Sequence, residues 1–176
     1  MKDSATLERQ AALQVASLMA AAARTAPKTR GIDNIRIVAI DDDADRERLL
    51  AKMRELAALE KRPSFARDAG NLAPAPAILL IGVEANPSGL DCGFCGQPHC
   101  EALTKAGGIC AFNSIDLGIA TSSAAGAAGR ACVDTRVMFS AGRAALALNL
   151  FGGNVRQALG IPLSITGKSP YFDRKP

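Results

Sequence analysis

The spacing of apolar side chains along the chain predicts four long helices. Apolar residues recur every three or four positions in four segments, residues 4–24, 43–61, 114–128 and 136–150. Asp41-Asp42-Asp43 supplies an N-cap and favourable negative charge at the start of the second segment. The third segment is rich in alanine and glycine, so a helix, a backbone or a flat ring can approach it closely. Helix packing is the commonest reason for such a composition.

Three shorter segments have the apolar pattern of strands, residues 34–40, 77–83 and 161–165. The middle one is a continuous apolar run, which predicts a central strand buried on both faces. Pro63 is expected to end the preceding helix, and the proline- and glycine-bearing segment 62–76 is expected to be a loop. The order of elements predicts an α+β domain with a central sheet flanked by helices. Without internal repeats or a linker, residues 1–176 are expected to form a single domain.

Composition and charge exclude several classes of function. A hydrophobic fraction of 48% in 176 residues argues against disorder and predicts a core large enough for a monomer or a small oligomer such as a homodimer. The net charge of +4 is spread along the chain and only 4% of residues are aromatic, so we expect no nucleic-acid partner. No segment approaches the ~20 apolar residues of a membrane-spanning helix. The apolar run 11–23 is expected to belong to the first helix rather than to a signal peptide, because Gln14 and Ser17 interrupt it.

Four of the five cysteines lie close together in the sequence, with the spacing C-x2-C-x4-C-x9-C formed by Cys92, Cys95, Cys100 and Cys110. Converging thiolates repel one another unless a soft cation or a cluster lies between them. Gly93 and Gly96 each follow a cysteine and allow backbone N–H groups to approach inorganic sulfide. We expect residues 90–112 to form a metal-binding module inserted between a strand and a helix.

Three interpretations of these cysteines remain open at this point: an iron-sulfur cluster, a zinc site, and a disulfide framework or inert thiols. Structural zinc sites usually pair two knuckles or include histidines, whereas this chain has one knuckle and two single cysteines, so the cluster is favoured. Pro98 is expected in the first turn of a short helix that carries Cys100. His99 is expected to be solvent-facing or hydrogen-bonded, and Cys132 to be an ordinary buried thiol. Free thiolates are typical of the reducing cytoplasm, which is the expected compartment.

The cysteine segment Cys92-Gly93-Phe94-Cys95-Gly96-Gln97-Pro98-His99-Cys100 resembles the 4Fe-4S domain of corrinoid iron-sulfur proteins, written C-G-x-C-G-x-x-x-C. A longer resemblance takes in most of the chain. It is similar to a prokaryotic family described as ferredoxin-domain-containing proteins of uncharacterised activity, through segments 90–96, 115–120, 133–138 and 161–174. The resemblance implies a 4Fe-4S cofactor held by Cys92, Cys95, Cys100 and Cys110.

The element order also resembles the flavin-binding nitroreductase fold. Residues 21–30 are similar to the alanine-proline segment that nitroreductases place beside FMN, and Gly167-Lys168 is similar to their C-terminal phosphate-contacting region. This resemblance implies FMN contacts from Lys28, Thr29, Arg30, Gly167 and Lys168, with the two segments side by side. The chain departs from the nitroreductase pattern because the arginine-rich phosphate motif near the start is absent. The alternative is that both segments are ordinary polar turns.

Two functional classes follow. The first is a 4Fe-4S redox or electron-transfer protein, flavin-linked and served by an unidentified redox partner. The second is a non-catalytic binding or scaffold protein with a structural zinc or iron-sulfur site. The chain has no G-x-S-x-G and no P-loop, and its single histidine excludes most histidine-based catalytic pairs. Any enzyme activity is therefore expected to be that of an oxidoreductase or an electron-transfer component.

Overall fold

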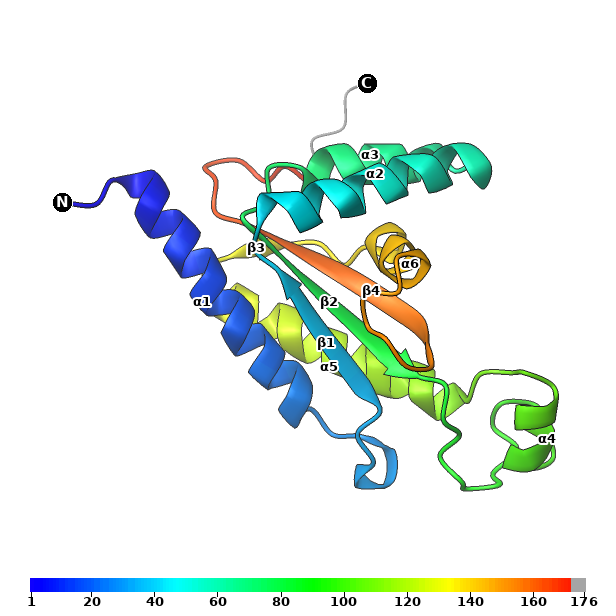
Figure 1. The fold of residues 1–176 in the computed structure, drawn as a ribbon. Coiled ribbons are helices and arrows are strands. Elements are labelled where there is room, and N and C mark those ends of the chain that lie inside the picture. Colours follow the sequence, from blue (N-terminus) through cyan, green and yellow to red (C-terminus); the bar gives the residue numbers. More distant parts are fainter. Residues whose placement is uncertain (172–176) are drawn as a thin grey trace.

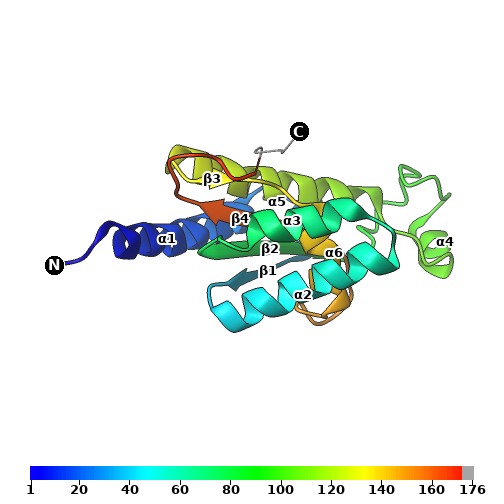
Figure 2. The same ribbon diagram turned by 90° about the horizontal axis from the view of Figure 1, so that it is seen from above.

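The computed structural model describes residues 1–171, which form a four-stranded antiparallel sheet with helices on both faces (Figures 1 and 2). The helices are α1 (Ser4–Thr25), α2 (Asp43–Leu59), α3 (Pro63–Leu72), α4 (Cys100–Lys105), α5 (Ala111–Arg130) and α6 (Phe139–Ala147), with a 3-10 turn, η1 (Thr29–Gly31), after α1. The strands are β1 (Ile35–Ile40), β2 (Ala77–Glu84), β3 (Asp134–Thr135) and β4 (Val155–Ser164). The predicted α+β class is confirmed, and residues 172–174 of the C-terminal segment quoted above lie outside the described range.

Strand β2 lies inside the sheet, whose order is β1-β2-β4-β3, and pairs antiparallel with β1 and β4. Successive side chains of a strand point to opposite faces. Leu79 and Ile81 accordingly pack in the core under α1 and α5, whereas Ile78 and Leu80 pack in the core under α2, α3 and α6. All four are fully buried, which confirms the prediction of a central strand buried on both faces.

Small side chains allow α1 and α5 to cross one face of the sheet side by side (Figure 1). Ala16 and Ala23 of α1 share a buried cluster with Ala120, Ala124 and Ala128 of α5. The prediction that helix packing explains the alanine-rich composition of residues 114–128, in α5, is confirmed. Within residues 1–171, neither these nor any other helix is both long and apolar enough to cross a membrane.

Helix α3 was not predicted, because segment 62–76 has the proline and glycine content of a loop. Pro63 lies after the end of α2, as expected, but it is also the first residue of α3. At this position its missing N–H costs nothing and its fixed φ favours the helix. Phe65, Ala69 and Leu72 then form a buried stripe at intervals of four and three residues. This spacing was the signal that could have identified the helix.

Tertiary hydrogen bonds shorten one predicted helix and lengthen one predicted strand. The helix predicted over 136–150 begins only at Phe139, because Met138 exchanges two backbone hydrogen bonds with Gly160, of 2.8 and 3.0 Å. Strand β4 starts at Val155 rather than near Ile161, since its polar first half pairs with the end of β2. Local pattern indicated neither pairing, because both join segments distant in sequence.

Gly142 marks the closest approach of α6 to the sheet and provides a test of this packing. A Cβ atom at this position would lie 1.9 Å from the carbonyl oxygen of Ala158 and 2.7 Å from the Cα of Leu159. Backbone atoms cannot move away as a side chain can, so Gly142→Ala should lower the free energy of unfolding by about 3 kcal/mol or more, measured by urea denaturation. Gly118→Ala is the matched control, because nothing lies within 4 Å of its added Cβ and alanine favours helix α5 by about 0.5–1 kcal/mol. Equal stabilities for the two variants would contradict the close contact.

Candidate metal centre

The cysteine module leaves the body of the fold where β2 ends and returns where α5 begins. Figure 1 shows the short helix α4 standing away from the sheet at this end of the molecule. The side-chain amide of Asn113, in the first turn of α5, donates to the carbonyl oxygens of Glu84 at 2.9 Å and Asn86 at 2.8 Å. Asn113 is 1% exposed, so these bonds are shielded from water. The two ends of the module are therefore held together by the fold itself.

All four predicted ligands line one pocket, together with Ser88, Phe94, Phe112 and neighbouring residues. Cys110 is buried, Cys95 and Cys100 are half-buried, and Cys92 is exposed. Across residues 1–171, no group of three or more histidine, cysteine, aspartate or glutamate side chains is arranged closely enough to hold a metal ion. The structure thus places the four thiols around one pocket.

Backbone turns in the module depend on left-handed conformations at two glycines. Gly93 and Gly96 have φ values of +71° and +82°, and the N–H of Gly96 donates to the carbonyl oxygen of Gly93 at 2.9 Å. Asp91, with φ of +48°, accepts a hydrogen bond of 2.6 Å from the N–H of Cys100, and this bond lowers the pKa of the Asp91 carboxyl. The loop therefore folds back so that Cys92 and Cys100 face the same pocket.

His99 is the N-cap of α4, since its Nδ1 accepts a 3.1 Å hydrogen bond from the N–H of Ala102. The prediction that this histidine is hydrogen-bonded or solvent-facing is confirmed. Pro98, predicted in the first helical turn, instead lies one residue before the cap. Proline suits this site because it disfavours a helical conformation for the residue before it.

Cys110 differs from the other three cysteines in having several hydrogen-bond donors around its sulfur. Its Sγ lies 3.6 Å from the hydroxyl of Ser88, which is 6% exposed. Burial alone raises the pKa of the Cys110 thiol, but hydrogen bonds from Ser88 and from the backbone of Asn113 and Phe112 outweigh it, so the pKa is lowered. A lowered pKa favours the thiolate, which is the form that binds metals.

The first predicted flavin-binding segment is occupied by contacts within the protein. Lys28 Nζ donates to the carbonyl oxygens of Ala23 and Ala26, both at 2.8 Å, and to that of Arg24, so that it caps the end of α1. An ammonium group has three donors, and all three are used here. Burial lowers the pKa of Lys28.

Thr29 and Arg30 join η1 to α5 and to the cysteine module. The N–H and hydroxyl of Thr29 donate to the carboxylate of Asp116, at 3.1 and 2.9 Å, and Asp116 is 5% exposed. Arg30 donates to the carbonyl oxygens of Ser88 at 2.8 Å and Gly89 at 3.3 Å. Thr29 therefore ties η1 to α5, and Arg30 ties it to the segment that leads into the cysteines.

The second predicted flavin-binding segment lies at the other end of the molecule. Residues 164–166 share a pocket with Ala5 and Arg9 near the start of α1, whereas Lys28 follows its end. A helix of 22 residues is about 33 Å long (Figure 1). The prediction that the two segments lie together is therefore wrong within one chain. Gly167 and Lys168 lie in the turn after β4, where the Thr166 hydroxyl donates to the Lys168 carbonyl oxygen at 2.7 Å.

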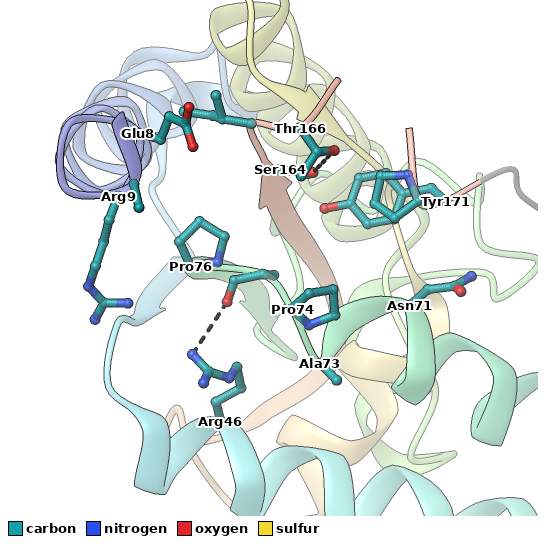
Figure 3. Close-up of a pocket in the computed structure, with 14 residues that line it drawn as sticks. Glu8, Arg9, Arg46, Asn71, Ala73, Pro74, Pro76, Ser164, Thr166 and Tyr171 are labelled. Carbon is teal, nitrogen blue, oxygen red and sulfur yellow. Dashed lines mark hydrogen bonds between the residues drawn. The ribbon is translucent and has the colours of Figure 1, made fainter. Parts of the chain in front are cut away.

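The pocket beside this turn was not identified from the sequence (Figure 3). It is a solvent-open cavity of about 360 Å³ between the start of α1, the residues before β2 and the end of β4. Tyr171 is 6% exposed, and its hydroxyl points into the pocket toward Ser164 and has no hydrogen-bond partner among residues 1–171. Burial, and secondarily the charge of Asp134, raise the pKa of Tyr171, so the hydroxyl stays protonated at neutral pH. In the sequence, the one feature that could have pointed to this pocket is Tyr171, the only tyrosine of the chain.

Cys132, predicted to be a buried thiol, is exposed. It lies just beyond the C-terminal end of α5 with a φ of +57°, in the turn that leads into β3. The short connection turns its side chain outward, a position that the apolar sequence context did not reveal.

Two solved structures share the fold of this chain. An FMN-bound nitroreductase from Bacteroides fragilis NCTC 9343 has a TM-score of 0.64 and 11% identity, covering 93% of this chain and 82% of its own. An FMN-bound nitroreductase from Desulfitobacterium hafniense DCB-2 has a TM-score of 0.62 and 16% identity, covering 92% and 82%. The predicted likeness to the nitroreductase fold is confirmed, and at these identities it concerns the fold alone.

Sequence comparison gives a closer relationship. An uncharacterized protein of Archaeoglobus fulgidus is 42% identical over 170 residues, which cover 92% of this chain and 90% of that protein. The family model described as "uncharacterized protein containing a ferredoxin domain (DUF2148)" matches residues 106–174, a range that includes Cys110 but not the other three predicted ligands. The archaeal relative matches this chain over nearly its whole length, and the family model matches its C-terminal part. The chain therefore belongs to the family of ferredoxin-domain-containing proteins.

Proposed function

We propose that the protein is an iron-sulfur redox protein in which Cys92, Cys95, Cys100 and Cys110 hold a 4Fe-4S cluster. The observation that carries the proposal is that these four thiols, spread over 19 residues of sequence, line one pocket. The described family, with its ferredoxin domain, supports the same redox function. The cluster would supply one-electron transfer, and the protein residues would hold it and adjust its potential.

The cysteine spacing and the backbone turns favour a cluster over a single zinc ion. Structural zinc sites usually pair two C-x2-C knuckles or include histidines. This chain has one knuckle, Cys92 and Cys95, followed by two single cysteines, Cys100 and Cys110. In addition, Gly93 and Gly96 turn the backbone around the pocket, which suits a cluster whose sulfides accept hydrogen bonds.

Exposure of the module suits electron exchange with a partner. Cys92 is exposed and the side chain of Phe94 is 64% exposed, whereas Cys110 lies beneath them. An electron carrier needs its redox centre near the surface, where a partner can approach. We therefore place the unidentified redox partner at the outer face of the module.

Metal and sulfide analysis of anaerobically purified protein tests the function directly. We expect about four iron atoms and about four acid-labile sulfides per chain, with a broad visible absorption band that bleaches on reduction. Stoichiometric zinc without colour would instead support the alternative of a structural metal in a binding or scaffold protein.

Substitution of the ligands tests their identity. Each of Cys92→Ser, Cys95→Ser, Cys100→Ser and Cys110→Ser should lose most of the bound iron, because each removes one of four thiolates from the cluster. Cys132→Ser is the matched control and should retain full iron. This exposed thiol follows the C-terminal end of α5, whereas Cys110 lies at the N-terminal end. Full iron in Cys110→Ser together with loss in Cys132→Ser would show that the fourth ligand is misassigned.

A second proposal is that the protein binds FMN at the pocket beside β4. It is supported by the fold shared with FMN-bound nitroreductases and by the unpartnered hydroxyl of Tyr171. A buried hydroxyl without a partner costs free energy that a ligand acceptor such as a phosphate or carbonyl oxygen would recover. In this placement Tyr171 and the turn at Gly167-Lys168 hold the ligand, and Lys28 does not. The flavin would supply hydride chemistry.

Titration with FMN, followed by the quenching of flavin fluorescence, tests this second proposal. Tyr171→Phe should weaken binding about tenfold and leave the free protein at least as stable as before, because it removes a buried hydroxyl that has no partner among the described residues. Lys168→Ala should also weaken binding. Lys28→Met should leave FMN affinity unchanged but lower the free energy of unfolding by about 1 kcal/mol, because it removes the cation that caps α1. Absence of binding at micromolar FMN would refute the proposal.

A further inference from the structure

The four proposed ligands are not equivalent, because Cys110 belongs to the rigid body of the fold. It is the N-cap of α5, a helix of 20 residues that packs on the sheet, and it is 7% exposed. The other three lie in the loop and short helix that stand away from the sheet (Figure 1). Contacts made by Cys110 are therefore the ones that the fold can hold in a defined geometry.

Ser88 is placed beside Cys110 by contacts on both sides. Its hydroxyl lies 3.6 Å from Cys110 Sγ, within the hydrogen-bond range for sulfur, and both residues line the pocket of the four cysteines. Its carbonyl oxygen accepts the 2.8 Å hydrogen bond from Arg30. Gly89, the next residue, has a φ of +68°, and a Cβ there would lie 3.1 Å from the Arg30 guanidinium. The backbone at Ser88 is thus held against η1.

The hydroxyl of Ser88 has no other hydrogen bond among the described side-chain contacts, and Ser88 is 6% exposed. When Cys110 is a thiolate, the sulfur has no proton to donate, so the hydroxyl is the donor. A hydrogen bond to a charged acceptor in a site with little water is stronger than one in solvent. The bond therefore acts on the electron density of one ligand sulfur.

We propose that Ser88 is a positioning residue that raises the reduction potential of the cluster through its hydrogen bond to Cys110. This inference rests on the proposed function. Reduction adds one electron, supplied in the test by dithionite, to the cluster and its thiolates, and no bond forms or breaks. The added negative charge makes the sulfur a better acceptor, so a donor stabilises the reduced state more than the oxidised state.

Potentiometric titration of Ser88→Ala, followed by visible absorption, tests the role of the hydroxyl. We expect the variant to retain its iron and to have a lower potential, with the oxidised–reduced equilibrium shifted about tenfold, or about 59 mV for one electron. Ser88→Thr keeps the hydroxyl and should return the potential toward that of the natural protein. An unchanged potential in iron-replete Ser88→Ala would overturn the inference.

A matched control separates this effect from a general loss of packing. Ser140 is also buried, at 2% exposed, and its hydroxyl donates to Asp68 at 2.7 Å on the α3 and α6 side of the sheet. Ser140→Ala should reduce stability without changing the reduction potential.

If Ser88→Ala fails to bind iron, Ser88→Val and Ser88→Thr make the same comparison, because the two side chains have nearly the same shape and only threonine has a hydroxyl. Equal potentials for that pair would also overturn the inference. Absence of a cluster from the natural protein would instead remove the proposed function.

Discussion

Burial of β2 on both faces is the constraint on which the rest of the structure depends. Ile78, Leu79, Leu80 and Ile81 are fully buried, and each contributes about 1.5–3 kcal/mol by removal from water. Because alternate side chains point to opposite faces, this one strand requires two separate apolar layers, one from α1 and α5 and one from α2, α3 and α6. Within the described residues, the five long helices cover these two faces, β1 and β4 pair with β2, and β3 pairs with β4.

The cysteine module inherits its position from the same strand. The connection that carries it begins just after Glu84, the last residue of β2, and ends where Ala111 starts α5. Asn113 ties these two points together through its bonds to the carbonyl oxygens of Glu84 and Asn86. Cys110, one of the proposed ligands, is therefore fixed by the core, while the other three lie in the loop and short helix that stand away from the sheet. An arrangement of this kind combines a defined ligand with access for a partner.

The two candidate cofactor sites lie at opposite ends of the molecule. Arg30, beyond the end of α1, contacts the module at Ser88, whereas Arg9, near the start of α1, lines the pocket of Tyr171. The separation is comparable to the length of α1, about 33 Å. A cluster held by the module and a flavin held in that pocket would therefore lie far apart within one chain.

Sequence patterns by themselves determined the elements whose apolar spacing is long and regular, and the residue types of the candidate metal centre. The α1 and β2 patterns were sufficient because burial of a whole stripe or run leaves few alternatives. The cysteine spacing similarly identified a candidate centre, since thiolates at short intervals have few other uses.

Only the tertiary structure decided which polar groups meet. The three donors of Lys28 bind carbonyl oxygens at the end of α1, and Met138 pairs with Gly160. The Tyr171 hydroxyl lies in a pocket without a partner among the described residues. Such contacts join residues far apart in the chain, and their energies depend on distance and desolvation, which no local pattern contains.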